Sequence, residues 1–380
     1  MCISACSSSP FSTSEESRQK PLFLDENFKG FDLMTIETEE YIFDLDNDMK
    51  EMVATKLRTE SNINKRTLKL IDNIFDKNGK SISYERNANV TAREAYHNNT
   101  ANCLSLTIMA YALATEAGLN VKFQQIDIPE YWVRNRQYNL LTGHINLLVN
   151  QNRFLRKNII SEGNGLQIDF DPQASKSTFK KFVIEKNTVI AMFYNNKGAE
   201  ALIDADYVSA YGYFKAAVLI APLFSSAWSN LGILYKLTNQ HQEAKVAYLY
   251  AISLDHDNLT AMENLAIILS QQGNIKEAQA IKQKLHFKRI KNPYYYALLA
   301  DEAFNNGQTR QAINFYNKAI KLERRVHEFY YRLATVYSYT GEVTLAKKAL
   351  TKAITYTKNA HTEEFYIAKL HLLVHLNSKY

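Results

Sequence analysis

The sequence predicts an α+β domain followed by an all-α solenoid of helical repeats. Up to about residue 185, helical patterns are followed by short stretches that alternate like strands. From Ala191 onward, alanines and other small residues recur every 34 residues. Only 12 Gly and 6 Pro occur in 380 residues, which favours long helices and few exposed loops.

The charge balance and the lack of cofactor motifs narrow the classes of function. The chain carries 45 Lys and Arg against 39 Asp and Glu, an excess too small and too scattered to indicate a nucleic-acid partner. The densest basic run, residues 282–291, is expected to be a solvated helix end rather than a polyanion site. No Walker loop, GxGxxG or HExxH pattern occurs, so the sequence predicts no cofactor and no metal.

Residues 1–21 form a segment of their own. Residues 3–6, Ile-Ser-Ala-Cys, resemble the lipobox of a bacterial lipoprotein, which makes Cys6 the expected lipidation site and the following Ser-rich tract a tether. That interpretation places the protein at the cell envelope, on the periplasmic side. The charged and apolar regions of a signal peptide are missing, so the alternatives are a truncated start or a disordered cytoplasmic tail. No apolar run of 18 residues occurs that would span a bilayer.

The α+β domain is expected to cover residues 22–185 and to begin with helices. From Leu33 to Phe75, apolar residues recur at a spacing of three to four, with acids between them. The acids of residues 37–48 predict a solvated helix surface; the alternative is a calcium or partner site, although the spacing matches no EF-hand loop. A second helix is predicted over residues 63–75. Both helices are expected to pack on the rest of the domain.

Cys103 is the only cysteine beyond the first six residues, and it begins an apolar helical run that ends at Gly118. A thiol at a helix N-terminus lies among backbone N–H groups and the positive end of the helix dipole, which stabilise a thiolate. The same N–H groups could hold the oxyanion of an acyl-transfer intermediate. The alternative is that Cys103 is a small buried hydrophobe. We treat Cys103 as a candidate nucleophile.

Two later strand-like stretches carry candidate partners for this thiol. His144 lies near the start of the first, and Asp169 is presented by the second. In a thiol triad the imidazole takes the proton of the thiol and the carboxylate orients the imidazole. His97 is the alternative base, but it lacks the strand context. Asp171 is the alternative acid, although its position before a proline suits a turn better.

The order of these residues resembles the transglutaminase-like superfamily, a papain-like cysteine fold. The similarity covers roughly residues 80–175. It is carried by the segments Ala101-Asn102-Cys103-Leu104-Ser105, Gly143-His144-Ile145-Asn146 and Gln167-Ile168-Asp169. The resemblance implies a Cys103–His144–Asp169 triad that acts on amide bonds. Asn102, beside the cysteine, is then a candidate substrate-binding residue.

An aromatic and basic insertion separates the predicted strand at 119–128 from the strand that carries His144. It covers residues 129–136. In a fold of the cysteine-protease type, such a loop would flank the cleft, so Trp132 is a candidate substrate contact. The alternative is that Trp132 caps the core.

From Ala191 the chain repeats with a period of 34 residues. Small residues occupy two registers and a large apolar residue occupies a third, which is broken at Lys282. The registers are Ala210, Ala244, Ala278, Ala312 and Ala346; Gly198, Gly232, Ala266, Ala300 and Ala334; and Phe214, Tyr248, Tyr316 and Leu350. Small residues let two antiparallel helices approach, and the large residue fills the gap beside them. The period and the run from Trp228 to Tyr235 resemble the tetratricopeptide repeat (TPR).

Five repeats are predicted over residues 191–360, with a capping helix in residues 361–380. The resemblance implies a groove that holds a protein or peptide partner. Few linker residues precede the repeats, so a fixed orientation to the α+β domain is expected. The sequence therefore predicts two alternative functions. The first is a thiol enzyme whose repeats deliver a protein substrate. The second is a non-catalytic adaptor whose α+β domain is silent.

Overall fold

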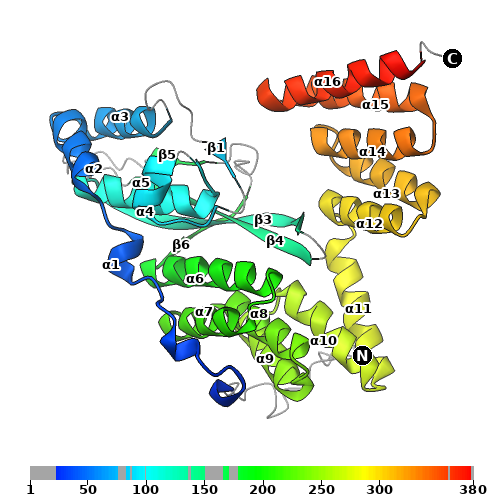
Figure 1. Cartoon of the computed structure of the whole chain (residues 1–380), viewed down its shortest axis with the longest axis horizontal. Helices are drawn as coiled ribbons and strands as arrows, with labels where there is room; N and C mark the ends of the chain where they lie inside the picture. Colours follow the sequence, from blue (N-terminus) through cyan, green and yellow to red (C-terminus); the bar gives the residue numbers. More distant parts are fainter. Residues whose placement is uncertain are drawn as a thin grey trace, which may run out of the picture. The chain divides into compact units, whose positions relative to one another are not determined.

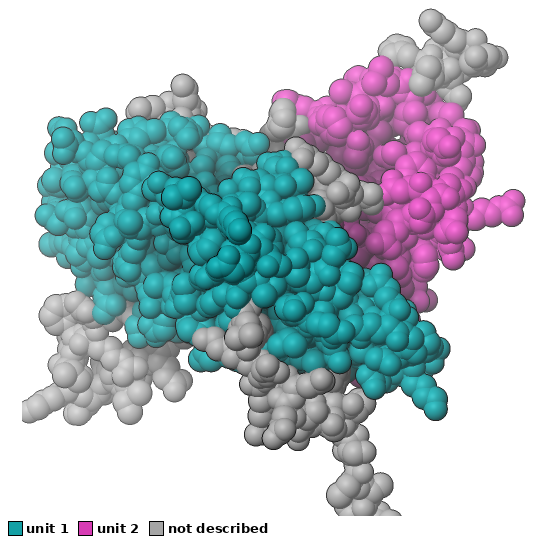
Figure 2. All heavy atoms as spheres, turned by 60° about the horizontal axis from the view of Figure 1, so that its bottom comes forward, with its two compact units in different colours: residues 1–128, 143–285 teal, residues 129–142, 286–380 magenta. Residues whose placement is uncertain are grey.

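The computed structural model describes residues 23–75, 83–85, 88–98, 100–135, 138–149, 166–170, 179–357 and 360–377. Cys6 and the whole predicted tether lie outside these residues, so lipidation stays a prediction. The chain divides into two compact units (Figure 2). Unit 1 comprises Met1–Ile128 and Gly143–Leu285, and unit 2 comprises Pro129–Thr142 and His286–Tyr380.

An α+β region precedes a long series of helices (Figure 1). The elements of the α+β region are η2 (Asp25–Asn27), η3 (Phe31–Leu33), α1 (Glu39–Ile42), α2 (Asn47–Met52), the π-helical turn η4 (Val53–Leu57), α3 (Ile63–Phe75), β1 (Ser83–Tyr84), α4 (Ala92–Asn98), β2 (Thr100–Ala101), α5 (Cys103–Glu116), β3 (Val121–Asn135), β4 (Tyr138–Val149), β5 (Leu166–Ile168) and β6 (Lys181–Ile184). The helical series comprises α6 (Lys186–Ile203), α7 (Tyr207–Ile220), α8 (Ser225–Leu237), α9 (His241–Leu254), α10 (Leu259–Gln271), α11 (Ile275–Arg289), α12 (Pro293–Asn305), α13 (Thr309–Leu322), α14 (His327–Tyr339), α15 (Val343–Tyr356) and α16 (Ala360–Asn377).

The helix expected from residue 33 onward is broken into short pieces. Thr38 accepts a hydrogen bond from the backbone N–H of Tyr41, and Asp46 accepts one from that of Met49. Each of these side chains caps the start of a new helix, which ends the preceding segment. The second predicted helix, over residues 63–75, is present as α3. The apolar periodicity therefore indicated helical structure correctly, but the capping side chains divide the segment into several short helices.

The acids between residues 37 and 48 form ion pairs rather than only a solvated face. Glu39 lies 2.7 Å from Lys186, and Asp44 lies 3.6 Å from Arg93. Asp46 also bonds Nε2 of His97 at 2.5 Å. These contacts tie the N-terminal helices to α4 and α6. His97 thereby has an acidic partner of its own.

Residues 23–34, here called the aromatic strap, pack on helices α7 and α8 of the repeats. The Phe28 ring stacks on Tyr211 with centroids 4.4 Å apart. Asp25 accepts hydrogen bonds from the Tyr211 hydroxyl and the Lys215 ammonium, both at 2.6 Å. The strap continues over α7, where a Cβ added to Gly212 would lie 2.3 Å from Met34 Sδ.

The main sheet has the order β5-β4-β3-β6. Strand β6 pairs only with residues 123–126 of β3, and β5 pairs with residues 147–149 of β4. The two long strands, β3 and β4, run on side by side beyond these neighbours (Figure 1). Among the described residues, β6 pairs with β3 up to Ile126 and has no partner for Pro129, a position that tolerates a residue without an N–H. The insertion predicted as a loop at 129–136 is a continuation of β3 through Asn135.

In the helical series, α6 packs on α7, α8 on α9, α12 on α13 and α14 on α15, with the 34-residue period that the sequence shows. A Cβ added to Gly198 would meet the Phe214 ring at 2.6 Å, and one added to Gly232 would meet the Tyr248 ring at 2.7 Å. The expected close approach of small and large residues is therefore present. The boundary between the two units falls inside α11, at Leu285. Lys282 of this helix is exposed where the other repeats place a buried aromatic ring or leucine, so this helix lacks that packing contact.

Candidate functional site

Helix α5 presents Cys103 at its first position. Asn102 is the cap: its side-chain oxygen accepts a hydrogen bond from the Ser105 N–H at 2.8 Å. The Ser105 hydroxyl in turn accepts from the Val90 N–H at 2.8 Å and donates to the Ala88 carbonyl at 3.2 Å. The start of α5 is thus held by the segment that precedes α4. Asn102, predicted to bind substrate, has a capping role that accounts for its side-chain oxygen.

The sheet brings His144 and Asp169 to this thiol. Cys103 Sγ lies 3.5 Å from His144 Nδ1, and His144 Nε2 lies 2.9 Å from an Asp169 carboxylate oxygen. The pairing of β4 with β5 explains the second contact. Leu147 is opposite Ile168, so a continuation of that register sets Asn146 opposite Asp169 and His144 diagonal to it. The three residues predicted as a triad are therefore neighbours in the folded chain.

Asn146 is a member of this cluster that sequence reasoning missed. Its side-chain nitrogen donates to the second oxygen of Asp169 at 3.2 Å, so both carboxylate oxygens are held. It shares a face of β4 with His144, two residues away, and this alternation is the signal that could have revealed it. The sulfur also contacts a main-chain acceptor, the Ile145 carbonyl, at 3.3 Å.

The cluster is buried. The exposed fraction is 8% for Cys103 and 3% for His144. Burial lowers the pKa of His144, but hydrogen bonds and charges from Asp169 and Cys103 outweigh it and raise the pKa from 6.5 to about 10. The imidazole is then a cation at neutral pH, placed between a carboxylate and a sulfur. Such a cation stabilises a thiolate beside it.

We expect the His144 ring to remain doubly protonated through neutral pH. Because its pKa is raised from 6.5 to about 10, this contribution to stability is fully present below pH 6.5 and is lost as the pH rises through about 10. Nitrogen NMR of the histidine rings should show that the His144 imidazole titrates far above 6.5. In Asp169→Asn that titration should move toward 6.5. A His144 ring that titrates near 6.5 in the wild-type chain would contradict this expectation.

The remaining predicted residues have other surroundings. Trp132 belongs to unit 2, where the Arg289 guanidinium lies 5.0 Å from the centre of its ring. His97, the alternative base, is exposed and pairs with Asp46. Asp171, the alternative acid, lies outside the described residues. A substrate contact for Trp132 stays a prediction.

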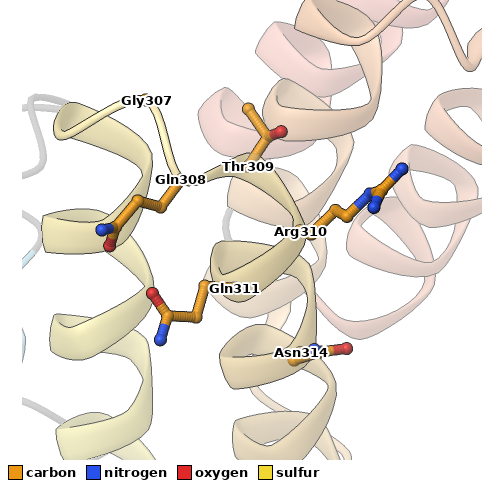
Figure 3. A pocket seen from close by; sticks show the side chains of 6 residues that line it. All are labelled: Gly307, Gln308, Thr309, Arg310, Gln311 and Asn314. Carbon is orange, nitrogen blue, oxygen red and sulfur yellow. The ribbon is translucent and has the colours of Figure 1, made fainter.

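A surface hollow in the described part of unit 2 offers no comparable chemistry. It lies where α13 begins and is lined by Gly307, Gln308, Thr309, Arg310, Gln311 and Asn314. Figure 3 shows the side chains of Gln308 and Gln311 on one side of this helix start and those of Arg310 and Asn314 on the other. One arginine and neutral amides provide neither a nucleophile nor a base.

Comparison with known families identifies the helical series. The family model of the tetratricopeptide repeat matches residues 225–258, 293–325 and 327–359, which are the pairs α8–α9, α12–α13 and α14–α15. These three segments are tetratricopeptide repeats, as the sequence predicted. The chain thus combines an α+β region with a C-terminal TPR solenoid.

Two curated relatives and one solved structure illustrate the similarity. The chain is 26% identical over 183 residues to the mouse protein O-mannosyl-transferase TMTC3, covering 43% of this chain and 19% of that protein. It is 31% identical over 85 residues to the uncharacterized protein ycf37 of Guillardia theta, covering 22% of this chain and 48% of that one. The chain therefore spans from a fifth to a half of these relatives. The structure of PilF from Pseudomonas aeruginosa is 15% identical, with a TM-score of 0.30, over 50% of this chain and 87% of PilF.

No helix within the described ranges combines the length and the apolarity needed to cross a bilayer.

Proposed function

We propose that this protein binds an extended segment of a partner protein on the first helices of its repeats. The three matched repeats support this function, because stacked helix pairs of this kind form extended binding surfaces. Since a fold alone does not define a function, the proposal depends on the side chains that these helices present.

A row of asparagines on the first helices of three successive pairs carries the proposal. Asn195 lies on α6, Asn230 on α8 and Asn264 on α10. Asn230 Nδ2 donates to Asn195 Oδ1 at 2.9 Å, and the Lys236 ammonium donates to Asn264 Oδ1 at 2.5 Å. A primary amide both donates and accepts hydrogen bonds, which suits the N–H and C=O groups of an extended peptide. Asn230 and Asn264 are partly exposed and would hold a backbone, whereas Asn195 is buried and orients Asn230.

Peptides selected from a random library on the immobilised full chain test this surface. The double substitution Asn230→Ala and Asn264→Ala should weaken their binding at least tenfold, because each lost hydrogen bond contributes about 1 kcal/mol and a tenfold change in Kd corresponds to about 1.4 kcal/mol. Gln242→Ala, at an exposed position of the second helix α9, is the matched control and should bind like the wild type. Selected peptides that bind the double variant unchanged would exclude this surface.

A second candidate function is thiol chemistry on amide bonds. The specific observation in its favour is the contact of Cys103, His144 and Asp169, three residues far apart in the sequence. The resemblance of these segments to the transglutaminase-like superfamily points to the same chemistry. Burial of the sulfur and the imidazole is the reason to rank this function second, since a substrate carbonyl must reach the sulfur.

In this candidate reaction, each residue of the cluster has one step. The Cys103 thiolate attacks the amide carbonyl, so that a C–S bond forms and the C–N bond breaks. The His144 imidazolium gives its proton to the departing amine. Water or an amine then attacks the thioester, gives a proton back to His144 and releases the thiolate. Asp169 orients the ring throughout, and Asn146 holds Asp169.

A further inference from the structure

The tip of the β3–β4 hairpin belongs to the same compact unit as the later repeats. This segment, Pro129–Thr142, is here called the hairpin arm. The remainder of the same two strands belongs to unit 1 (Figure 2). Within unit 2 the arm contacts the end of α11 and helix α12.

A buried arginine receives the acidic side chain of the arm. Arg289, the last residue of α11, donates from Nε and Nη2 to the two Glu130 oxygens at 2.7 and 2.9 Å. Its side chain is only 4% exposed. Asn292 Nδ2 donates to the Glu130 main-chain carbonyl at 2.8 Å, so both the side chain and the backbone of Glu130 are recognised. A paired geometry of this kind is selective for a carboxylate.

Two aromatic residues follow Glu130 and occupy neighbouring aromatic surfaces. The Tyr131 ring meets Tyr294 edge-on, with centroids 4.8 Å apart. Trp132 lies under the Arg289 guanidinium at 5.0 Å and beside Tyr295 at 6.4 Å. The helix start α12 therefore contributes both rings that meet the arm. Planar rings of this kind give much contact area at a small loss of conformational freedom.

We infer that the end of α11 and the start of α12 form a receptor for an extended segment with an acid followed by two aromatic residues, and that the hairpin arm occupies it in cis. In trans, this receptor fits a segment of a partner protein that also has an acid followed by two aromatic residues. That segment must displace the arm. This inference rests on the proposed protein-binding role of the repeats and names a surface separate from the asparagine row. The arm competes strongly because it is tethered, at an effective concentration on the order of millimolar.

Competition by a synthetic peptide tests the receptor in the full-length chain. The probe is a fluorescent peptide that reproduces residues 127–134. In Glu130→Gln the arm loses the carboxylate that Arg289 needs, so the probe should bind at least tenfold more tightly than it binds the wild type. A probe with Gln in place of Glu130 should not show this tenfold tighter binding to the variant. Adding Arg289→Gln to Glu130→Gln should also abolish it.

Equal binding of the probe to the wild type and to a folded Glu130→Gln variant would overturn the inference and leave the arm as a fixed structural contact. If that variant does not fold, the wild-type chain decides: excess probe should accelerate hydrogen exchange of the arm, and unchanged exchange would overturn the inference. The peptides selected on the immobilised full chain are the independent control. Their loss of binding in Asn230→Ala with Asn264→Ala concerns the proposed function and not this receptor.

Discussion

Replacing His144 by alanine is expected to slow alkylation of Cys103 by iodoacetamide about 100-fold near neutral pH, a typical contribution of a positioned acid–base group. The thiolate is the reactive form of cysteine, and the imidazolium 3.5 Å away stabilises it. Asp169→Asn should give an intermediate rate, because it removes the carboxylate that keeps the ring charged and oriented. The rate is measured by mass spectrometry of the peptide that contains Cys103.

The labelling experiment needs a variant without the other thiols, because the chain has 3 cysteines. Cys2→Ser and Cys6→Ser leave Cys103 as the sole thiol. His97→Ala is the matched control, since His97 is an exposed histidine that pairs with Asp46, and its loss should leave the rate unchanged. Slow labelling that His144→Ala does not alter would identify Cys103 as a buried hydrophobe and leave only the protein-binding function.

Gly232→Val is expected to lower the free energy of unfolding of the repeats by about 3 kcal/mol, the upper part of the range for overpacking in a core. A Cβ at this position would already lie 2.7 Å from the ring of Tyr248, which is fully buried. The ring cannot move away without separating α8 from α9. Gly232→Ala should have a smaller effect, since the better helix propensity of alanine offsets part of the clash.

Urea unfolding followed by tryptophan fluorescence measures this loss. The chain has 2 Trp, so a Trp132→Phe background leaves Trp228, on the same helix as Gly232, as the reporter. Ser226→Val, at an exposed position of α8, controls for the effect of a β-branched residue on the helix itself. A loss of stability that is equal in the two variants would show that the approach of α8 to α9 is not the cause.

Much of the candidate site followed from local signals. Cys103 at the start of an apolar run predicted a helix N-terminus, and the structure has α5 begin at that residue. Alternation predicted strands for His144 and Asp169. Asn146 was missed because its role depends on which residue of β5 lies opposite it, and register is a property of the paired strands.

The errors share a physical cause. The arm was predicted as a loop because Pro129 and the mixed polar and aromatic residues after it resemble a turn region. A strand position without a ladder partner tolerates such a proline, but only the register of β3 with β6 reveals where these positions lie among the described residues. Likewise, nothing local in the aromatic strap indicates that Phe28 stacks on Tyr211, 183 positions later.

By itself, the sequence determined the helical repeats, because small and large residues 34 positions apart specify how each helix approaches its pair partner. It also determined the chemistry of the thiol cluster, since only residue type decides which side chains donate, accept or attack. The tertiary structure alone decided which surfaces the chain covers with its own segments. Strap and arm bind regions of the repeats far away in sequence, and such contacts leave no periodic trace along the chain.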